Sequence, residues 1–261
     1  MSVYLERLGD MMKTKKAYVQ IAFQGLLLFF ALFITKFLLE FMAPSPLRSV
    51  LQGILIFALF YLINQQILKV KVPYYSQIQP LKTQINALIP LWIFMLWANL
   101  PLFFEAKLEY IFDAFIYSLV AGLLEEYVVR GLFLGYLEEH IVRDMKSLWF
   151  SLLLTSFIFG LAHTSNILTQ PLDYTLFQIV TSTFGGLFYG AIYLRTRSLV
   201  WAMFAHFLQD FSSLASQGNI EAVQQDVSWF LLFFAIIVFG SLSCILIRPK
   251  YMVPIIQESN Y

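Results

Sequence analysis

Charged residues are scarce in this chain. They make up 13% of its 261 residues, while 59% are hydrophobic; soluble domains carry roughly 25% charged residues. So little charge leaves almost nothing for a soluble domain, and the composition indicates a polytopic membrane protein. The formal net charge of +1 gives no reason to expect a nucleic-acid partner.

Cysteine is nearly absent as well. The single residue, Cys244, excludes an intrachain disulfide. It lies in the last apolar stretch, where we expect a small buried hydrophobic side chain rather than a nucleophile.

Long apolar stretches are abundant. Eight of them approach or exceed the roughly 20 residues that cross a bilayer as a helix. They are residues 18–41, 49–68, 85–104, 111–136, 147–168, 174–194, 198–215 and 229–247. We therefore predict an all-α protein with about eight transmembrane helices in a single domain, residues 18–247.

The distribution of Lys and Arg predicts the orientation. An even number of spans puts both ends of the chain on one side of the membrane. The segments on that side that carry Lys and Arg are 1–17, 69–82, 143–146, 195–197 and 248–250. Cytosolic segments carry such an excess, so we expect a basic cytosolic tail at 1–17 and a second cytosolic tail at 248–261.

Three charged residues lie close together in the middle part of the fourth span: Glu125, Glu126 and Arg130. A charge at the bilayer centre costs roughly 2.5–3.5 kcal/mol on insertion scales. Glu126 and Arg130 are four residues apart, so they share a helix face and can pair. That pair could be purely structural, but Glu125 projects about 100° away and can face a cavity.

Two further spans carry histidines. His163 follows Phe159 by four residues in the fifth span, and His206 precedes Asp210 by four in the seventh. With Glu125, these side chains could bind a divalent metal such as zinc. They could equally hold a water molecule without a metal while His206 polarises a carbonyl. The spacing leaves both open, and no span carries the HExxH pattern of soluble zinc proteases.

The depth of His163 is a difficulty for this site. At about 1.5 Å per residue, Glu125 and His206 fall near the middle of the membrane, whereas His163 falls nearer to the outer surface. We expect His163 to join the others only if its helix is strongly tilted or begins before residue 147.

These patterns resemble the three motifs of the CPBP family of intramembrane proteases. The family includes CAAX prenyl endopeptidases and bacterial "Abi" or bacteriocin self-immunity proteins. In chain order the patterns are Glu125-Glu126-x-x-x-Arg130, Phe159-x-x-x-His163 and His206-x-x-x-Asp210. The resemblance covers about residues 120–212 and includes the close-packing pair Gly186 and Gly190. Asp210 stands where many members have Asn.

The resemblance implies roles for these residues. Glu125 would activate water, and His163 would share that water. His206 and Asp210 would stabilise the oxyanion or add coordination. The supporting residues would be Glu126, Arg130 and Phe159. Members are described both as metalloproteases and as metal-independent glutamate proteases, so a divalent metal or no cofactor is expected.

The leading hypothesis is therefore an intramembrane endopeptidase with a protease-like core at about 111–215. It would cleave a small peptide or a membrane-associated protein in a bacterial cell membrane. One alternative is a non-catalytic immunity protein that binds a bacteriocin. A second is an ion-coupled carrier, although the chain shows no inverted repeat of the usual kind. The expected partners are a peptide or membrane-protein substrate and the lipid bilayer.

Overall fold

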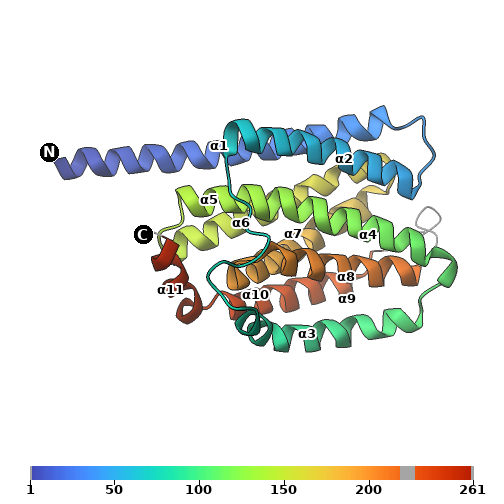
Figure 1. The fold of residues 1–261 in the computed structure, drawn as a ribbon. Helices are drawn as coiled ribbons and strands as arrows, with labels where there is room; N and C mark the ends of the chain where they lie inside the picture. The colour runs from blue at the N-terminus through green and yellow to red at the C-terminus, as the bar shows by residue number, and fades with distance from the viewer. Residues whose placement is uncertain (1, 218–226, 260–261) are drawn as a thin grey trace.

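The computed structural model describes residues 2–217 and 227–259, and all regular structure in these two stretches is helical. Figure 1 shows long helices running side by side as a bundle. The prediction of an all-α membrane protein is confirmed. The last two residues of the predicted C-terminal tail, 260 and 261, lie outside the described residues.

The first part of the chain forms three long helices. They are α1 (Ser2–Leu38), α2 (Pro46–Ile63) with its π-helical extension η1 (Asn64–Leu68), and α3 (Leu81–Phe104). A short 3-10 turn, η2 (Leu108–Tyr110), leads into the site-bearing half.

The second part begins with one continuous helical segment that changes type twice. Its pieces are α4 (Ile111–Glu126), the π-helix η3 (Tyr127–Leu134) and α5 (Gly135–His140). The following helices are α6 (Met145–Ala162) with the 3-10 helix η4 (His163–Leu168), α7 (Leu172–Thr196) and α8 (Leu199–Gln217). The last segment comprises α9 (Trp229–Phe234), η5 (Ala235–Phe239), α10 (Gly240–Leu246) and α11 (Pro249–Ser259).

Helical structure covers most of every predicted span, and the helix boundaries differ from the predicted ones at several ends; two differences are large. α1 begins at Ser2, well before the apolar stretch that starts at residue 18. α11 forms inside the predicted C-terminal tail. Hydropathy marks where a helix is apolar, whereas backbone hydrogen bonds let it continue through polar residues, so helical structure extends beyond the apolar stretches.

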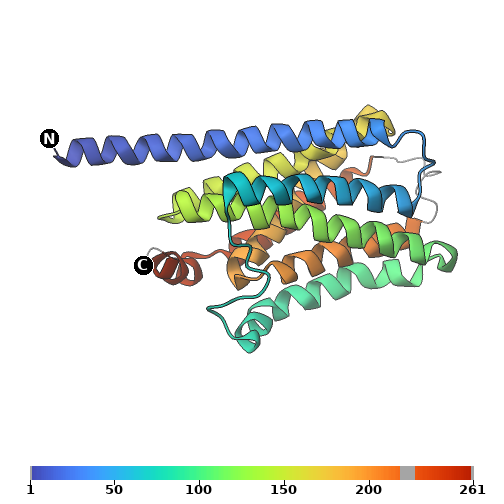
Figure 2. The ribbon, with the colours of Figure 1, turned by 45° about the horizontal axis from the view of Figure 1, so that its top comes forward.

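Five helical segments in the described part are long and apolar enough to cross a membrane. They are Met11–Leu38, Pro46–Leu68, Met145–Leu168, Leu172–Thr196 and Trp229–Leu246. They make the chain an integral membrane protein, whereas the count of eight spans stays a prediction. Figures 1 and 2 show the start of α1 and helix α11 at the same end of the bundle, as an even number of crossings requires.

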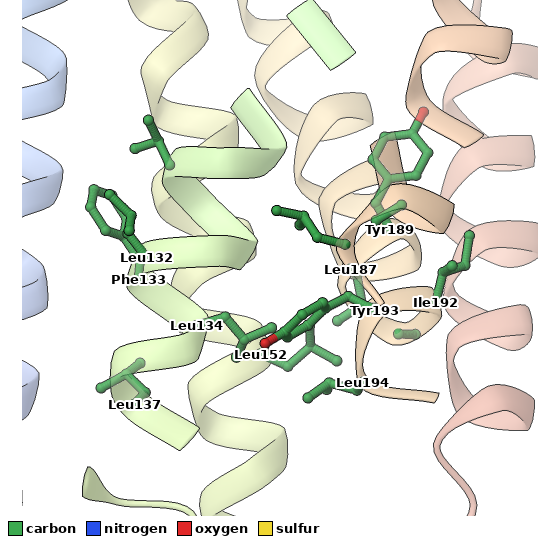
Figure 3. Close-up of a cluster of buried hydrophobic side chains, with 14 of the residues drawn as sticks. Leu132, Phe133, Leu134, Leu137, Leu152, Leu187, Tyr189, Ile192, Tyr193 and Leu194 are labelled. Atoms are coloured by element: carbon green, nitrogen blue, oxygen red, sulfur yellow. The ribbon is translucent and has the colours of Figure 1, made fainter. Parts of the chain in front are cut away.

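Glycines let α6 and α7 pack closely. A Cβ atom on Gly190 would clash with Cδ1 of Leu152, and one on Gly160 would clash with Thr183 of α7. The predicted packing role of Gly190 is thus supported by its surroundings. Figure 3 shows Leu152 with the buried apolar side chains of η3, α5 and α7 around it.

The loop between η1 and α3 fixes the start of α8. The backbone amides of Leu199 and Val200 donate to the carbonyl oxygens of Pro73 (2.9 Å) and Tyr74 (3.2 Å). These amides belong to the first turn of α8, which has no acceptor within its own helix. The loop therefore positions the helix that carries His206.

Cys244 is exposed on α10, so the prediction of a buried side chain is wrong. The outward faces of a membrane protein are apolar too, so an apolar sequence does not distinguish them from the interior.

Candidate active site

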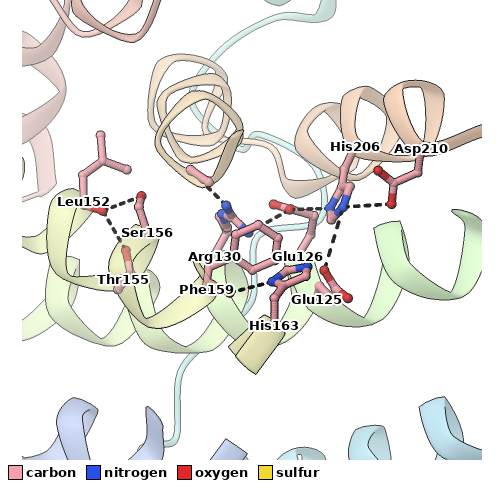
Figure 4. Close-up of polar contacts among 11 residues, drawn as sticks. Glu125, Glu126, Arg130, Leu152, Thr155, Ser156, Phe159, His163, His206 and Asp210 are labelled. Atoms are coloured by element: carbon pink, nitrogen blue, oxygen red, sulfur yellow. Dashed lines mark hydrogen bonds and ion pairs between the residues drawn. The ribbon is translucent and has the colours of Figure 1, made fainter. Parts of the chain in front are cut away.

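The centre of the site is a buried ion pair at the junction of α4 and η3. Arg130 Nη1 donates to Glu126 Oε1 at 2.8 Å, and the two side chains are 1% and 0% exposed. Arg130 Nη2 donates to the carbonyl oxygen of Gly186 on α7, also at 2.8 Å (Figure 4). The expected pairing is present, and each charge has a partner away from water, which its burial requires.

Aromatic rings enclose the arginine. Arg130 Cζ lies 4.5 Å from the ring centroid of Phe159 on α6 and 5.7 Å from that of Tyr189 on α7. Both distances are within the range of a cation–π interaction. The ion pair of α4 and η3 is thereby fixed against two neighbouring helices.

His206 bridges the carboxylates. Its Nδ1 lies 2.9 Å from Glu126 Oε1, and its Nε2 lies 3.3 Å from Asp210 Oδ2 and 3.8 Å from Glu125 Oε2. The imidazole stacks on Tyr189 with the centroids 4.7 Å apart and the planes at 14°. A carboxylate oxygen accepts hydrogen bonds, so each ring nitrogen that carries a proton can donate to the carboxylate it faces.

Glu125 lies at the open side of this cluster. Its side chain is 35% exposed and that of Asp210 is 36% exposed, in contrast to the closed Glu126–Arg130 pair. Glu125 Oε2 is nevertheless buried and accepts no hydrogen bond from any described residue. A carboxylate with an unsatisfied oxygen at an opening is placed to accept a hydrogen bond from a molecule that enters.

His163 joins the site although it caps the end of α6. Its Nδ1 lies 3.0 Å from the carbonyl oxygen of Phe159, which can only accept, so Nδ1 donates this hydrogen bond and Nε2 takes no part in it. The Phe159 ring lies 5.1 Å from the His163 ring and 5.7 Å from the His206 ring. Figure 4 shows His163 on the same side of the cluster as Glu125. His163 therefore lies beside Glu125 and His206 despite the difference in depth that the sequence predicts.

A glycine that the sequence reading passed over allows α4 and α8 to meet. A Cβ on Gly122 would lie 3.0 Å from the carbonyl oxygen of Met203 and 3.1 Å from the amide nitrogen of Phe207. The two backbones are thus close enough for side chains one turn further along each helix to reach one another.

Tyr189 is the second residue that the sequence reading missed. It contacts both His206 and Arg130. An uncharged tyrosine in an apolar stretch gives no signal by itself; its position just before Gly190 in the close-packing motif is the one available hint.

The donor atoms do not fit a metal centre. In the described ranges, no three His, Cys, Asp or Glu residues are grouped so that they could hold a metal ion. A catalytic zinc usually has three protein ligands. Both nitrogens of His206 already face carboxylates, and Nε2 of His163 is one donor.

Residues 107–212 match the family model described as type II CAAX prenyl endopeptidase Rce1-like. This stretch contains Glu125, His163, His206 and Asp210, and the resemblance drawn from the motifs is confirmed. No curated protein and no solved structure matches the chain.

Proposed function

We propose that this chain is a member of the Rce1-like family of type II CAAX prenyl endopeptidases, whose model matches residues 107–212, and that it hydrolyses a peptide bond with a water molecule activated by Glu125. The family is a protease family, and the five apolar helical segments put this member in a membrane. The unsatisfied Oε2 of Glu125 beside His206 carries the proposal. The proposed substrate is a small peptide or a membrane-protein segment, and the proposed location is a bacterial cell membrane.

In the first step, a water molecule donates one hydrogen bond to Glu125 and the other to Nε2 of His163. As the water oxygen attacks the scissile carbonyl carbon, the proton passes to the Glu125 carboxylate. A positioned base of this kind contributes roughly 10²–10⁴-fold to the rate.

His206 is the proposed donor to the carbonyl oxygen. Its Nε2 makes only long contacts, 3.3 Å to Asp210 and 3.8 Å to Glu125, at the side where both carboxylates are partly exposed. A substrate oxygen can take this hydrogen bond as negative charge develops on it. Ionised Asp210 cannot donate, so its role is to orient the imidazole, while Glu126 supports the other nitrogen.

The tetrahedral intermediate then collapses. The carbon–nitrogen bond breaks, the oxygen regains its double bond, and protonated Glu125 gives its proton to the departing amine. Glu125 is ionised again, and the products are a carboxylic acid and an amine.

The test is cleavage of a quenched peptide library by purified protein in liposomes. Glu125→Gln keeps the size of the side chain but removes the base, so we expect a loss of at least about 100-fold. Glu139→Gln, at an exposed carboxylate of α5, is the matched control and should keep activity. A chelator should have no effect.

Equal cleavage by wild type and Glu125→Gln would refute the proposed base. Loss of cleavage on chelation, restored by added zinc, would refute the metal-free mechanism. Bacteriocin protection that survives Glu125→Gln in cells would favour immunity by binding.

A further inference from the structure

Lys36 is a cation in an apolar segment without a carboxylate partner. It lies near the end of α1, within the membrane-spanning stretch Met11–Leu38, and its side chain is half-buried. Among the described residues no Asp or Glu forms an ion pair with it. Cations inside membranes usually pair with anions or carbonyls and often belong to functional sites.

Lys36 is directed at a neighbouring element. Its Nζ donates to Oδ1 of Asn166 in η4. Asn166 is fixed in turn, because its Nδ2 donates to Oε1 of Gln178 on α7 at 2.8 Å. A lysine near a helix end normally extends its ammonium to the membrane surface. Here a network across three elements holds the ammonium against a neutral amide instead.

This network adjoins the candidate active site. Asn166 follows His163 by three residues in the 3-10 helix η4, and side chains three apart in such a helix lie on the same side. The charge of Lys36 also interacts with that of Glu125. The ammonium is therefore on the η4 side of the reacting groups.

A second positive charge strengthens the field around Lys36. Arg48 of α2 donates to the carbonyl oxygens of Met42 at 3.0 Å and of Lys36 at 3.2 Å. Carbonyls satisfy its hydrogen bonds but leave its charge uncompensated. Lys36 and Arg48 thus make this edge of the site positive.

We propose that Lys36 binds a carboxylate group of the substrate and so selects peptides with an acidic group on the η4 side of the scissile bond. The inference rests on the proposed peptidase function. An ammonium has three donors, and Asn166 accepts from one of them. A carboxylate supplies a negative charge within ion-pair distance and further acceptors, and such charge-assisted bonds are strong. The carboxylate belongs either to an Asp or Glu side chain or to the C-terminus of a peptide.

Four fluorescent peptides separate the two sources. They carry Glu or Gln at one position on the η4 side of the cleaved bond, each with a free or an amidated C-terminus. Binding is measured with Glu125→Gln protein in liposomes, and cleavage with otherwise wild-type protein. We expect roughly tenfold tighter binding of the acidic form, as for a hydrogen bond between charged groups, and loss of that preference in Lys36→Gln.

Three control variants distinguish charge recognition from a structural role. Lys36→Arg should keep the preference, and Lys36→Glu should reverse it in favour of a peptide with Lys at the same position. Lys15→Gln removes an exposed lysine from the same helix, about 31 Å away, and should change nothing.

The outcomes separate this inference from the proposed function. Glu125-dependent cleavage with the same charge preference in wild type and Lys36→Gln would overturn the carboxylate site alone. Absence of any preference among the four peptides would overturn it too. Lys36-dependent binding without cleavage would support the site and refute the peptidase.

Discussion

At the scale of single residues, the site depends on uncharged rings as much as on its charged groups. Glu126 and Asp210 hold the two nitrogens of His206, but a pair of hydrogen bonds lets the ring plane tilt. The stacking contact with Tyr189 fixes that plane. Tyr189 is therefore a positioning residue for the proposed oxyanion donor.

Tyr189→Leu should lower kcat for peptide cleavage by several-fold to tenfold with little change in KM, because an aromatic pair contributes about 0.5–1.5 kcal/mol beyond burial. Tyr189→Phe keeps the ring and should retain near wild-type kcat. Steady-state kinetics on one library peptide provides the measurement. An equally large loss in both variants would assign the effect to the hydroxyl and contradict the stacking role.

The charged and histidine residues of the site were predictable because such side chains are rare in apolar helices. Glu125, His163 and His206 come together as their motifs indicated. The sequence did not predict Tyr189 as a site residue, nor Lys36 of the proposed carboxylate-binding site. Tyr189 gives no signal because tyrosine is ordinary in an apolar helix. Lys36 gives none because it lies near a helix end, where lysine is common.

At the scale of elements, Gly186 serves both the close packing of α6 against α7 and the hydrogen bonding of Arg130. A Cβ there would lie 2.9 Å from Cδ1 of Phe159 and 3.0 Å from Nη2 of Arg130, while its carbonyl accepts from the same Arg130 nitrogen. The close approach of α6 and α7 is therefore also the geometry that satisfies the arginine.

Gly186→Ala should destabilise the protein by about 1–3 kcal/mol, the usual cost of overpacking, and should reduce cleavage because Arg130 must shift. Gly185→Ala is the matched control, since its Cβ would meet only Tyr189 Cε2 at an ordinary 3.7 Å. Thermal unfolding in detergent reports stability, and the peptide assay reports activity. Equal midpoints for the two variants would contradict this account.

Hydropathy located the long helices but not their internal changes of type. The π-helix η3 spans Tyr127–Leu134 and includes Arg130. π-helices are rare in proteins, and those that occur are often found at functional sites. The apolar residues of η3 are nevertheless equally suited to an α-helix. The wider turn of the π-helix depends on packing against neighbouring helices, which one segment of sequence does not specify.

At the scale of the whole molecule, the same-sided ends of the bundle can be tested by labelling. In a Cys244→Ser background, Ser2→Cys and Lys250→Cys should face the cytosol. An impermeant maleimide should therefore label them only after the cells are opened. Ser45→Cys, between α1 and α2, should react from the outside with an impermeant maleimide. Opposite reactivity of the two terminal positions would refute the even number of crossings.

The number of crossings was harder to predict than the fold class. The segment with the candidate site, α4 to α5, is not among the five sufficiently apolar segments; its charged residues are Asp113, Glu125, Glu126, Arg130, Glu138 and Glu139. The charges that the site requires lower the hydropathy of the helix that holds them. The membrane signal is therefore weak where the chemistry is concentrated.

The loop from Lys69 to Pro80 supports two of the elements that form the candidate site. The family match begins at residue 107, yet the loop supplies the acceptors for the first amides of α8, and its Val72 lies against Gly131 of η3. A chain that began at residue 107, where the family match begins, would lose both contacts. The first hundred residues are thus an integral part of the fold that holds the candidate site, and the matched residues 107–212 do not form a self-contained unit.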